Sequence, residues 1–183
     1  MGLEPTRIAG VHLSRLEPIL DERGSFTRTF SAQEFVEAGL DPGIAQCSVS
    51  NNSTQATLRG MHLQGAPHGE TKLIRCTRGS VFDVAVDVRP GSPTFGEWIG
   101  FQLDGSDALA VVLEPGIAHG FVTLTPHAEL SYQISAPYHP GAAIGFRWND
   151  PDVSIDWPVQ PIVVSERDRA LPLLAELDPR TTT

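Results

Sequence analysis

The sequence predicts an all-β protein, a jelly-roll β-barrel or sandwich with short peripheral helices. Gly and Pro are abundant, with 17 and 15 among 183 residues, and they separate short runs that are rich in β-branched side chains. Few stretches repeat their apolar residues with the period of a helix. About eight short strands divided by turns are typical of this fold, whose open mouth is a natural pocket for a small ligand.

The clearest strand is expected at residues 80–88. Phe82, Val84 and Val86 lie on one face of this segment, and Asp83 and Asp87 lie on the other. This period of two residues predicts a half-buried strand, with its apolar face toward the core and the two carboxylates toward solvent. The turn sequence RPGSP at 89–93 ends the strand.

Turn residues separate seven further strands, which are expected at residues 44–50, 57–64, 72–77, 97–103, 109–113, 119–124 and 129–135. Helices are expected only at 32–38 and 166–177, and the residues after Asp178 are expected to fray. Because no repeat or linker is evident, we expect a single domain over residues 1–183. Its N-terminal strands reach to about residue 50, a jelly-roll core spans about 51–150, and a C-terminal extension follows.

The length and composition of the chain argue against several classes of protein, namely disulfide-stapled, nucleic-acid-binding and membrane-inserted proteins. A chain of this length buries roughly 70% of its unfolded surface, so its core needs neither disulfides nor a structural metal. Cys47 and Cys76 are therefore expected to be small buried hydrophobes in a reducing, cytoplasmic setting. A net charge of -9, with 13 Lys and Arg spread along the chain, argues against a nucleic-acid groove. No secretion signal and no apolar run of about 18 residues is evident, which argues against membrane insertion.

Three histidines lie in or beside predicted strands, namely His62, His68 and His119. If His62 and His119 point into one barrel, a metal site is the first hypothesis. Gln64 and Glu70 are the nearest further ligands, but a third imidazole or a suitably spaced carboxylate is missing, so metal binding is the weaker interpretation.

Acid–base chemistry is the alternative use of His62, because an imidazole accepts a proton near neutral pH. A carboxylate would have to orient the ring. Asp168 is a candidate for this carboxylate, but it is distant in the sequence and only the fold could bring it near His62. Gly60 is the residue that would let Arg59 and His62 face one pocket, because a glycine inside a strand often marks a bulge. The other interpretation is a plain strand with Arg59 in solvent.

Ten ordered blocks of the sequence resemble the dTDP-4-dehydrorhamnose 3,5-epimerase family, and together they cover most of the chain. They are DERGSF (21–26), TLRGMHLQ (57–64), TKLIRC (71–76), FDVAVDVR (82–89), GSPTFG (91–96), PGIAHGF (115–121), Tyr132 with Tyr138, RWNDP (147–151), IDWP (155–158) and SERD (165–168).

The resemblance implies a metal-independent jelly roll of the cupin type that needs no cofactor. It also implies a homodimer in which an N-terminal arm crosses to the partner. The implied substrate is a dTDP-linked 4-keto-6-deoxyhexose, whose C4 ketone makes the hydrogens on C3 and C5 removable as protons.

The resemblance also assigns roles to residues. His62 corresponds to the general base, Asp168 to its carboxylate partner, Tyr132 to the acid on the opposite face, and Lys72 to the cation near O4. The substrate-binding positions comprise two diphosphate clamps (Arg23 and Arg59), two faces that stack on thymine (Phe26 and Tyr138), and four hydrogen-bonding residues (Gln46, Ser50, Asn51 and His119).

Three departures from the better-known family pattern leave the number of inverted centres open. The connection from Ser50 to Leu58 is longer, Arg28 stands where an acidic residue is common, and the block QCSVSN at 46–51 differs. They resemble the branch in antibiotic-sugar pathways, some members of which invert only C3. The alternatives are a 3,4-ketoisomerase acting on the same keto sugar, a non-catalytic sugar-nucleotide-binding cupin, and a metal-dependent cupin dioxygenase.

Overall fold

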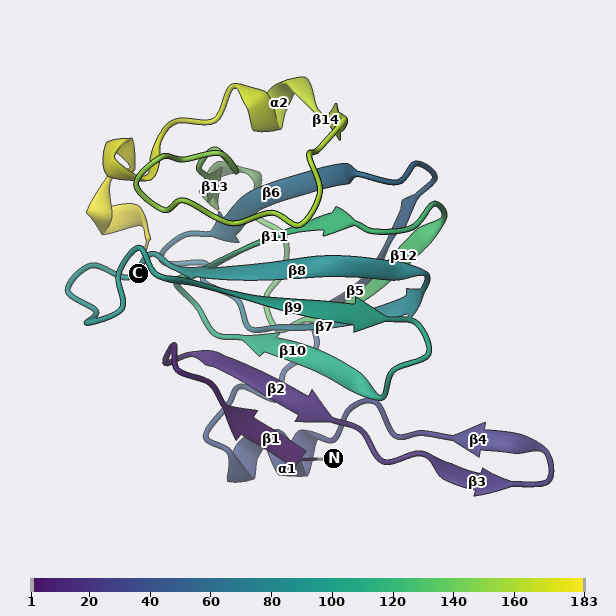
Figure 1. Ribbon diagram of the computed structural model, residues 1–183. Coiled ribbons are helices and arrows are strands. Elements are labelled where there is room, and N and C mark those ends of the chain that lie inside the picture. Colours follow the sequence, from purple (N-terminus) through teal and green to yellow (C-terminus); the bar gives the residue numbers. More distant parts are fainter. Residues whose placement is uncertain (1, 183) are drawn as a thin grey trace.

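Two β-sheets face each other in the computed structural model, which describes residues 2–182 (Figure 1). The first sheet has the strand order β1 (Gly2–Pro5), β2 (Val11–Arg15), β10 (Leu109–Leu113), β7 (Lys72–Arg78), β12 (Ala128–Ile134) and β5 (Gln46–Asn52). The second has the order β13 (Ala143–Gly145), β6 (Thr57–Gln64), β11 (Ile117–Thr123), β8 (Ser80–Asp87) and β9 (Trp98–Asp104), with β14 (Val163–Val164) parallel to β6. The predicted jelly roll and its eight predicted strands are confirmed.

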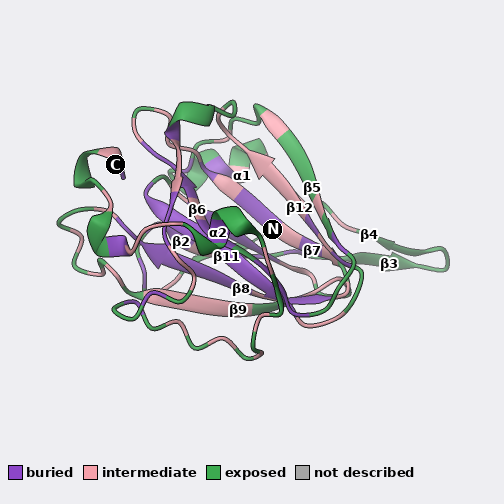
Figure 2. Ribbon diagram, turned by 90° about the horizontal axis from the view of Figure 1, so that it is seen from above, coloured by how far each residue is buried: buried purple, intermediate pink, exposed green. Residues whose placement is uncertain are grey.

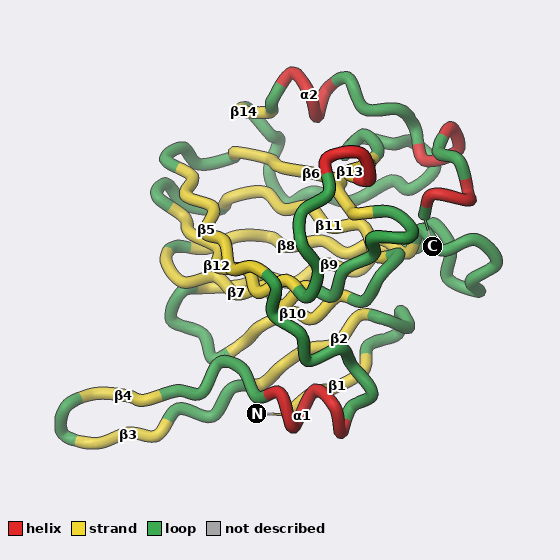
Figure 3. Tube along the Cα trace, turned by 180° about the vertical axis from the view of Figure 1, so that it is seen from behind, coloured by secondary structure: helices red, strands yellow, loops and turns green. Residues whose placement is uncertain are grey.

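A two-stranded hairpin of β3 (Ile19–Asp21) and β4 (Gly24–Phe26) projects from the body of the molecule (Figures 1 and 3). Its apolar side chains are exposed: Ile19, Leu20 and Phe26 keep 68%, 76% and 73% of their surface accessible. The predicted first helix is present as α1 (Ala32–Glu37). Phe35 of this helix packs with Leu73 and Val112 on the outer side of the first sheet.

The central strands β6, β8 and β11 are the most buried part of the structure (Figure 2). Ile74, Val111, Phe121 and Leu130 pack together between the two sheets. Val84 and Val86 lie in a second cluster with residues of the C-terminal segment, such as Phe146. The second sheet is therefore covered on both faces.

This double cover corrects the prediction for residues 80–88. Val84 and Val86 face the C-terminal segment, and the alternate residues of β8 face the barrel interior, where Asp83 and Asp87 are fully buried. The period of two residues is correct, but the two faces have other surroundings than expected. The C-terminal segment covers the apolar face, which would otherwise meet solvent, so the carboxylates can face the interior.

The C-terminal predictions also need correction. The expected helix at 166–177 consists of α2 (Glu166–Arg169) and a separate 3-10 turn, η2 (Leu174–Glu176). Pro172 lies between them and cannot continue a helix. Residues 179–182 are ordered rather than frayed, and residue 183 lies outside the described residues: η3 (Pro179–Thr181) follows a cap by Asp178, and the carbonyl of Thr181 accepts a hydrogen bond from the backbone of Ala66 at 3.1 Å.

The two cysteines differ. Cys76 is buried as predicted, and burial raises the pKa of its thiol to about 11. The prediction that Cys47 is buried was wrong, since it lies exposed on β5, the edge strand of the first sheet. Among the described residues, no helix is long and apolar enough to cross a membrane.

Candidate active site

A pocket of about 800 Å³ opens between the two sheets. One wall comes from β5, β7 and β12 of the first sheet, and the facing wall comes from β6 and β11 of the second. The segment from β14 to α2 completes the pocket beside β6. Nine of the twelve site residues expected from the sequence line it, namely Gln46, Ser50, Arg59, His62, Lys72, His119, Tyr132, Tyr138 and Asp168.

His62 and Asp168 meet in this pocket. Nε2 of His62 lies 2.7 Å from Oδ1 of Asp168, and the other carboxylate oxygen accepts the backbone N–H of Gly60 at 3.3 Å. The side chain of Ser165 caps α2 by accepting the backbone N–H of Asp168, which fixes where the carboxylate emerges. An ionised carboxylate only accepts hydrogen bonds, so Nε2 of His62 carries the proton and Nδ1 of the neutral ring is the basic atom.

The environment keeps Asp168 ionised. Burial alone opposes the charge, but the hydrogen bond from His62, together with the positive charge that this ring carries when it is protonated, outweighs burial, with help from the N–H of Gly60 and from Ser165. The net effect lowers the pKa of the Asp168 carboxyl. A permanently charged partner holds the imidazole in one orientation and stabilises it when it becomes protonated.

Gly60 resets the alternation of β6, which is the first of the two interpretations that the sequence left open. The pairing of β6 with β11 shifts register between His119 and Phe121, opposite this point, and both Arg59 and His62 line the pocket. Nε of Arg59 donates to the side-chain oxygen of Asn52 at 2.9 Å, which directs the guanidinium along the pocket wall.

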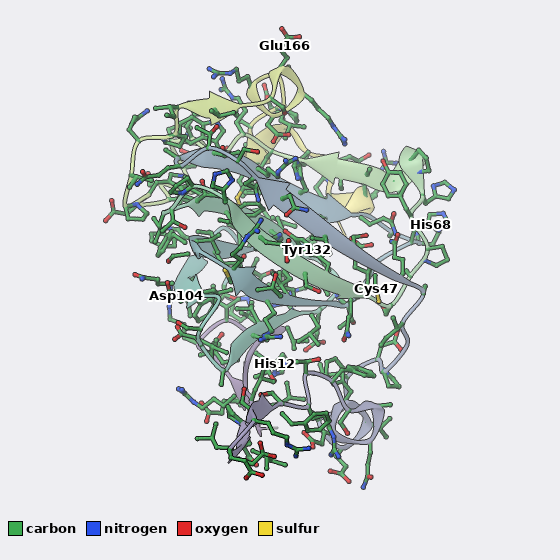
Figure 4. All side chains as sticks on the ribbon, turned by 90° about the vertical axis from the view of Figure 1, so that its right-hand side faces the viewer. His12, Cys47, His68, Asp104, Tyr132 and Glu166 are labelled. Carbon is green, nitrogen blue, oxygen red and sulfur yellow. The ribbon has the colours of Figure 1, made fainter. Side chains whose placement is uncertain are left out.

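Tyr132 faces His62 from the opposite sheet. It projects from β12, opposite Ser48 of β5, and lies in the interior of the barrel (Figure 4). Its ring meets the edge of the His119 ring, with the ring centres 5.9 Å apart. Burial and the negative charge of Asp83 raise the pKa of the Tyr132 phenol well above its ordinary value, although Arg59 acts in the opposite direction. Tyr132 is therefore a neutral O–H donor at physiological pH.

Lys72 brings a positive charge into the same pocket from β7. Its Nζ forms an ion pair with Oε1 of Glu70 at 3.0 Å, and the two side chains are only 12% and 10% exposed. Because both residues line the pocket, the ammonium is held at a defined place in a partly desolvated environment.

His119 is anchored by a residue that the sequence analysis had assigned to solvent. Its Nε2 lies 2.7 Å from Oδ2 of Asp83, and both side chains are buried. Among the described residues, Oδ1 of Asp83 has no hydrogen-bond partner. Asp83 was missed because its role depends on β8 facing the barrel interior. The local sequence showed one sign of a buried role for Asp83, namely that this carboxylate lies between the apolar residues Phe82 and Val84.

The expected nucleotide-binding residues fall into two groups. Gln46 and Ser50 line the pocket on one face of β5, and Ser48, which the sequence analysis did not single out, lies between them on the same face. Asn51 lies on the opposite face of this strand. Arg23 and Phe26 belong to the projecting hairpin, outside this pocket, where Arg23 pairs with Asp21.

The two residues considered as further metal ligands have other partners. Gln64 binds the backbone of two loops, and Glu70 pairs with Lys72. Within residues 2–182, no group of three or more His, Cys, Asp or Glu side chains is arranged to hold a metal ion.

Comparison with known proteins places this geometry in context. The sequence model of the family described as dTDP-4-dehydrorhamnose 3,5-epimerase matches residues 5–176. A dTDP-4-dehydrorhamnose 3,5-epimerase of Sinorhizobium fredii is 40% identical over 178 residues, which cover 97% of this chain and 91% of the relative. A dTDP-4-dehydrorhamnose 3-epimerase of Streptomyces niveus is 41% identical over 177 residues, which cover 96% and 85%.

A solved structure agrees with these relatives. The dTDP-6-deoxy-D-glucose-3,5-epimerase of Legionella pneumophila, in complex with dTDP-4-keto-L-rhamnose, superposes with a TM-score of 0.90 at 36% identity. The superposition covers 97% of this chain and 94% of the other.

Proposed function

The chain belongs to the dTDP-4-dehydrorhamnose 3,5-epimerase family, and we propose that His62, Lys72 and Tyr132 carry out its reaction. It is an isomerase of deoxysugar biosynthesis that inverts a carbon next to the ketone of a dTDP-linked 4-keto-6-deoxyhexose. The observation that supports this assignment of roles is that a base and an acid lie on facing sheets of one pocket, which is also lined by the ammonium group of Lys72 from β7, the neighbour of β12.

The first step is the removal of a proton from carbon. Nδ1 of His62 takes the proton, the C–H bond breaks, and its electron pair moves through the carbonyl to place a negative charge on O4. Lys72 stabilises this enolate with a charge that is already in place, so little reorganisation of solvent is needed as the reaction proceeds. Asp168 stabilises the imidazolium that results.

The second step returns a proton to the other face of the same carbon. The enolate electrons form a new C–H bond with the phenolic proton of Tyr132, and the carbonyl at C4 is restored. Solvent then reprotonates the phenolate and removes the proton from His62. Two groups on opposite faces give inversion, whereas a single base would return the proton to the face from which it came.

Arg59, Tyr138 and the polar residues of β5 are proposed to hold the nucleotide. The planar guanidinium of Arg59 suits a diphosphate, which it can bind through two parallel hydrogen bonds. Tyr138 lies at the pocket with 58% of its surface exposed, so its ring face is available for a pyrimidine. Gln46 and Ser50 offer hydrogen bonds from the neighbouring wall, and His119 does so from β11.

The projecting hairpin is proposed to act as a dimer arm. Its exposed Leu20 and Phe26 are apolar surface without cover from the described residues, and Arg23 lies at its tip. In a homodimer, Arg23 and Phe26 would complete the nucleotide site of the partner. Mixed dimers test this: Arg23→Ala and His62→Asn subunits, each inactive alone, would together regain activity only if the arm acts across the interface.

The proposed reaction is tested by incubating the protein with dTDP-4-keto-6-deoxyglucose in deuterium oxide and following C3 and C5 separately by NMR. We expect deuterium at each carbon that is inverted, which also decides between the two activities of the relatives. Movement of the carbonyl to C3 would identify a ketoisomerase. Tight binding without any exchange above the protein-free control would identify a non-catalytic binding protein.

A further inference from the structure

Gln64 is a buried amide at the wall of the pocket with no part in the proposed proton transfers. It is the last residue of β6, two positions after His62 and on the same face, and only 4% of its surface is exposed. A buried amide requires partners for both its N–H groups and its oxygen.

All three hydrogen bonds of this side chain go to the backbone of two loops. Its Nε2 donates to the carbonyl of His68 at 2.8 Å and to the carbonyl of Pro137 at 3.1 Å, and its Oε1 accepts the backbone N–H of His139 at 2.7 Å. Gln64 therefore joins the loop before β7 to the loop after β12.

The second of these loops carries Tyr138, which lies between the two residues that Gln64 holds. More than half of its side-chain surface is exposed, so packing against the protein contributes little to its position. The imidazoles of His68 and His139 stack with ring centres 3.8 Å apart and planes within 8°, which adds a second contact between the same two loops. His68 lies at the edge of the molecule, away from the interior position of Tyr132 (Figure 4).

We infer that Gln64 is a positioning residue that holds Tyr138 in place for stacking on the nucleoside base. This inference rests on the proposed function, in which Tyr138 contacts the base. An aromatic ring that is already fixed loses little conformational freedom when a ligand arrives, so more of the stacking energy contributes to affinity. Without the amide, two loop carbonyls and one N–H would lose their buried partner, and the loop would be free to rearrange.

The experiment is a calorimetric titration with dTDP, the nucleotide without the sugar, of the wild type, Gln64→Met, Tyr138→Ala and the double variant. Methionine approximates the shape of glutamine and removes all three hydrogen bonds. We expect Tyr138→Ala to weaken dTDP binding roughly 10- to 100-fold, the range of one base–aromatic stack. Gln64→Met should weaken binding about tenfold, and it should have no further effect once Tyr138 is absent.

Two comparisons keep the test specific. Gln55→Met is the matched control, because the amide of Gln55 donates to the carbonyl of Leu124 and does not line the pocket, and dTDP affinity should stay unchanged. Gln64→Glu provides a second variant if Gln64→Met does not fold. The glutamate keeps an acceptor for the backbone N–H of His139, but its carboxylate cannot donate to the carbonyls of His68 and Pro137 and is repelled by them. With the full substrate, KM should rise and kcat should stay within about twofold.

The outcomes are distinct. Wild-type affinity in a Gln64 variant, with or without a fall in thermal stability, would overturn the inference, and so would an additive loss in the double variant. A wild-type protein that does not bind dTDP would overturn the proposed function and this inference with it.

Discussion

His62 Nε2 lies 2.7 Å from Asp168 Oδ1, although 106 residues separate the two along the chain. His62 belongs to β6, and Asp168 belongs to α2, a short helix in the C-terminal segment that lies over this strand (Figure 1). The parallel pairing of β14 with β6 brings this helix to the strand. The C-terminal segment therefore provides part of the active site as well as cover for the sheet.

Asp168→Asn should lower kcat by a factor on the order of 10²–10⁴, because the amide no longer selects one tautomer of His62 or stabilises its protonated form. The affinity for dTDP should stay near that of the wild type. Steady-state kinetics and nucleotide titration measure the two effects. The matched control is Asp178→Asn, a surface carboxylate that pairs with Arg180 away from the pocket. Equal kcat values in Asp168→Asn and the wild type would contradict the role of the pair.

Tyr132→Phe should separate proton exchange from inversion. The base can still remove a proton and return one from solvent to the same face, so deuterium should enter the substrate while the inverted product forms at least about 100-fold more slowly. NMR in deuterium oxide reports both processes in one sample. Inversion at the wild-type rate would show that another group donates the second proton.

Gly60→Ala should destabilise the protein by roughly 3 kcal/mol or more. Its φ of +144° is unfavourable for a side chain, and a Cβ would lie 2.6 Å from the Cα of Gly120 on the neighbouring strand. Gly91→Ala separates these causes, because Gly91 also has a positive φ but a Cβ there meets no atom within 4 Å. That control should lose only about 1 kcal/mol in chemical denaturation. Equal losses in both variants would argue against crowding between β6 and β11.

Asp87 should contribute to stability in a pH-dependent way. Burial opposes its ionisation, but hydrogen bonds from Arg89, Ser92 and Thr94 outweigh burial and lower its pKa from 3.8 to about 2. A carboxyl with a lowered pKa in the folded state stabilises that state above the unfolded pKa, and this contribution is lost as pH falls from about 4 toward 2. The difference corresponds to about 2 kcal/mol.

Denaturation of the wild type and Asp87→Asn between pH 7 and pH 2 checks this expectation. The stability difference between the two proteins should be constant above about pH 5 and shrink below pH 4, because a protonated carboxyl is neutral like the amide. Other acidic groups affect both proteins alike. A difference that does not change with pH would show that the charge of Asp87 does not contribute.

Local patterns predicted the strands of the barrel well because turn residues and alternation are local properties. The segments at 57–64 and 109–113 have the predicted bounds, and Gly60 marks the point where the register of β6 changes. The short strands β13 and β14 had no such signal. They form because the C-terminal segment lies against β6, which is a property of the whole fold.

The site was predictable to the extent that its residues lie on strands and carry distinctive chemistry. His62, Lys72 and Tyr132 belong to three strands that turn residues delimit in the sequence, and the family resemblance gives the three residues their roles. Their meeting in one pocket follows from the order of strands in the sheets. The contact of Asp83 with His119 could not be predicted, because it depends on which face of β8 is interior. The contacts of Gln64 could not be predicted either, because they depend on two loops that meet at the end of β6. Such relationships arise only from tertiary packing.

The role of His62 as the base is tested most directly by the rate at which His62→Asn incorporates deuterium from solvent at C3 and C5 of dTDP-4-keto-6-deoxyglucose. We expect this rate to fall at least about 1,000-fold while dTDP binds as it does to the wild type, because the base is lost and the nucleotide site is intact. Deuterium incorporation at the wild-type rate by His62→Asn would show that a different group removes the proton.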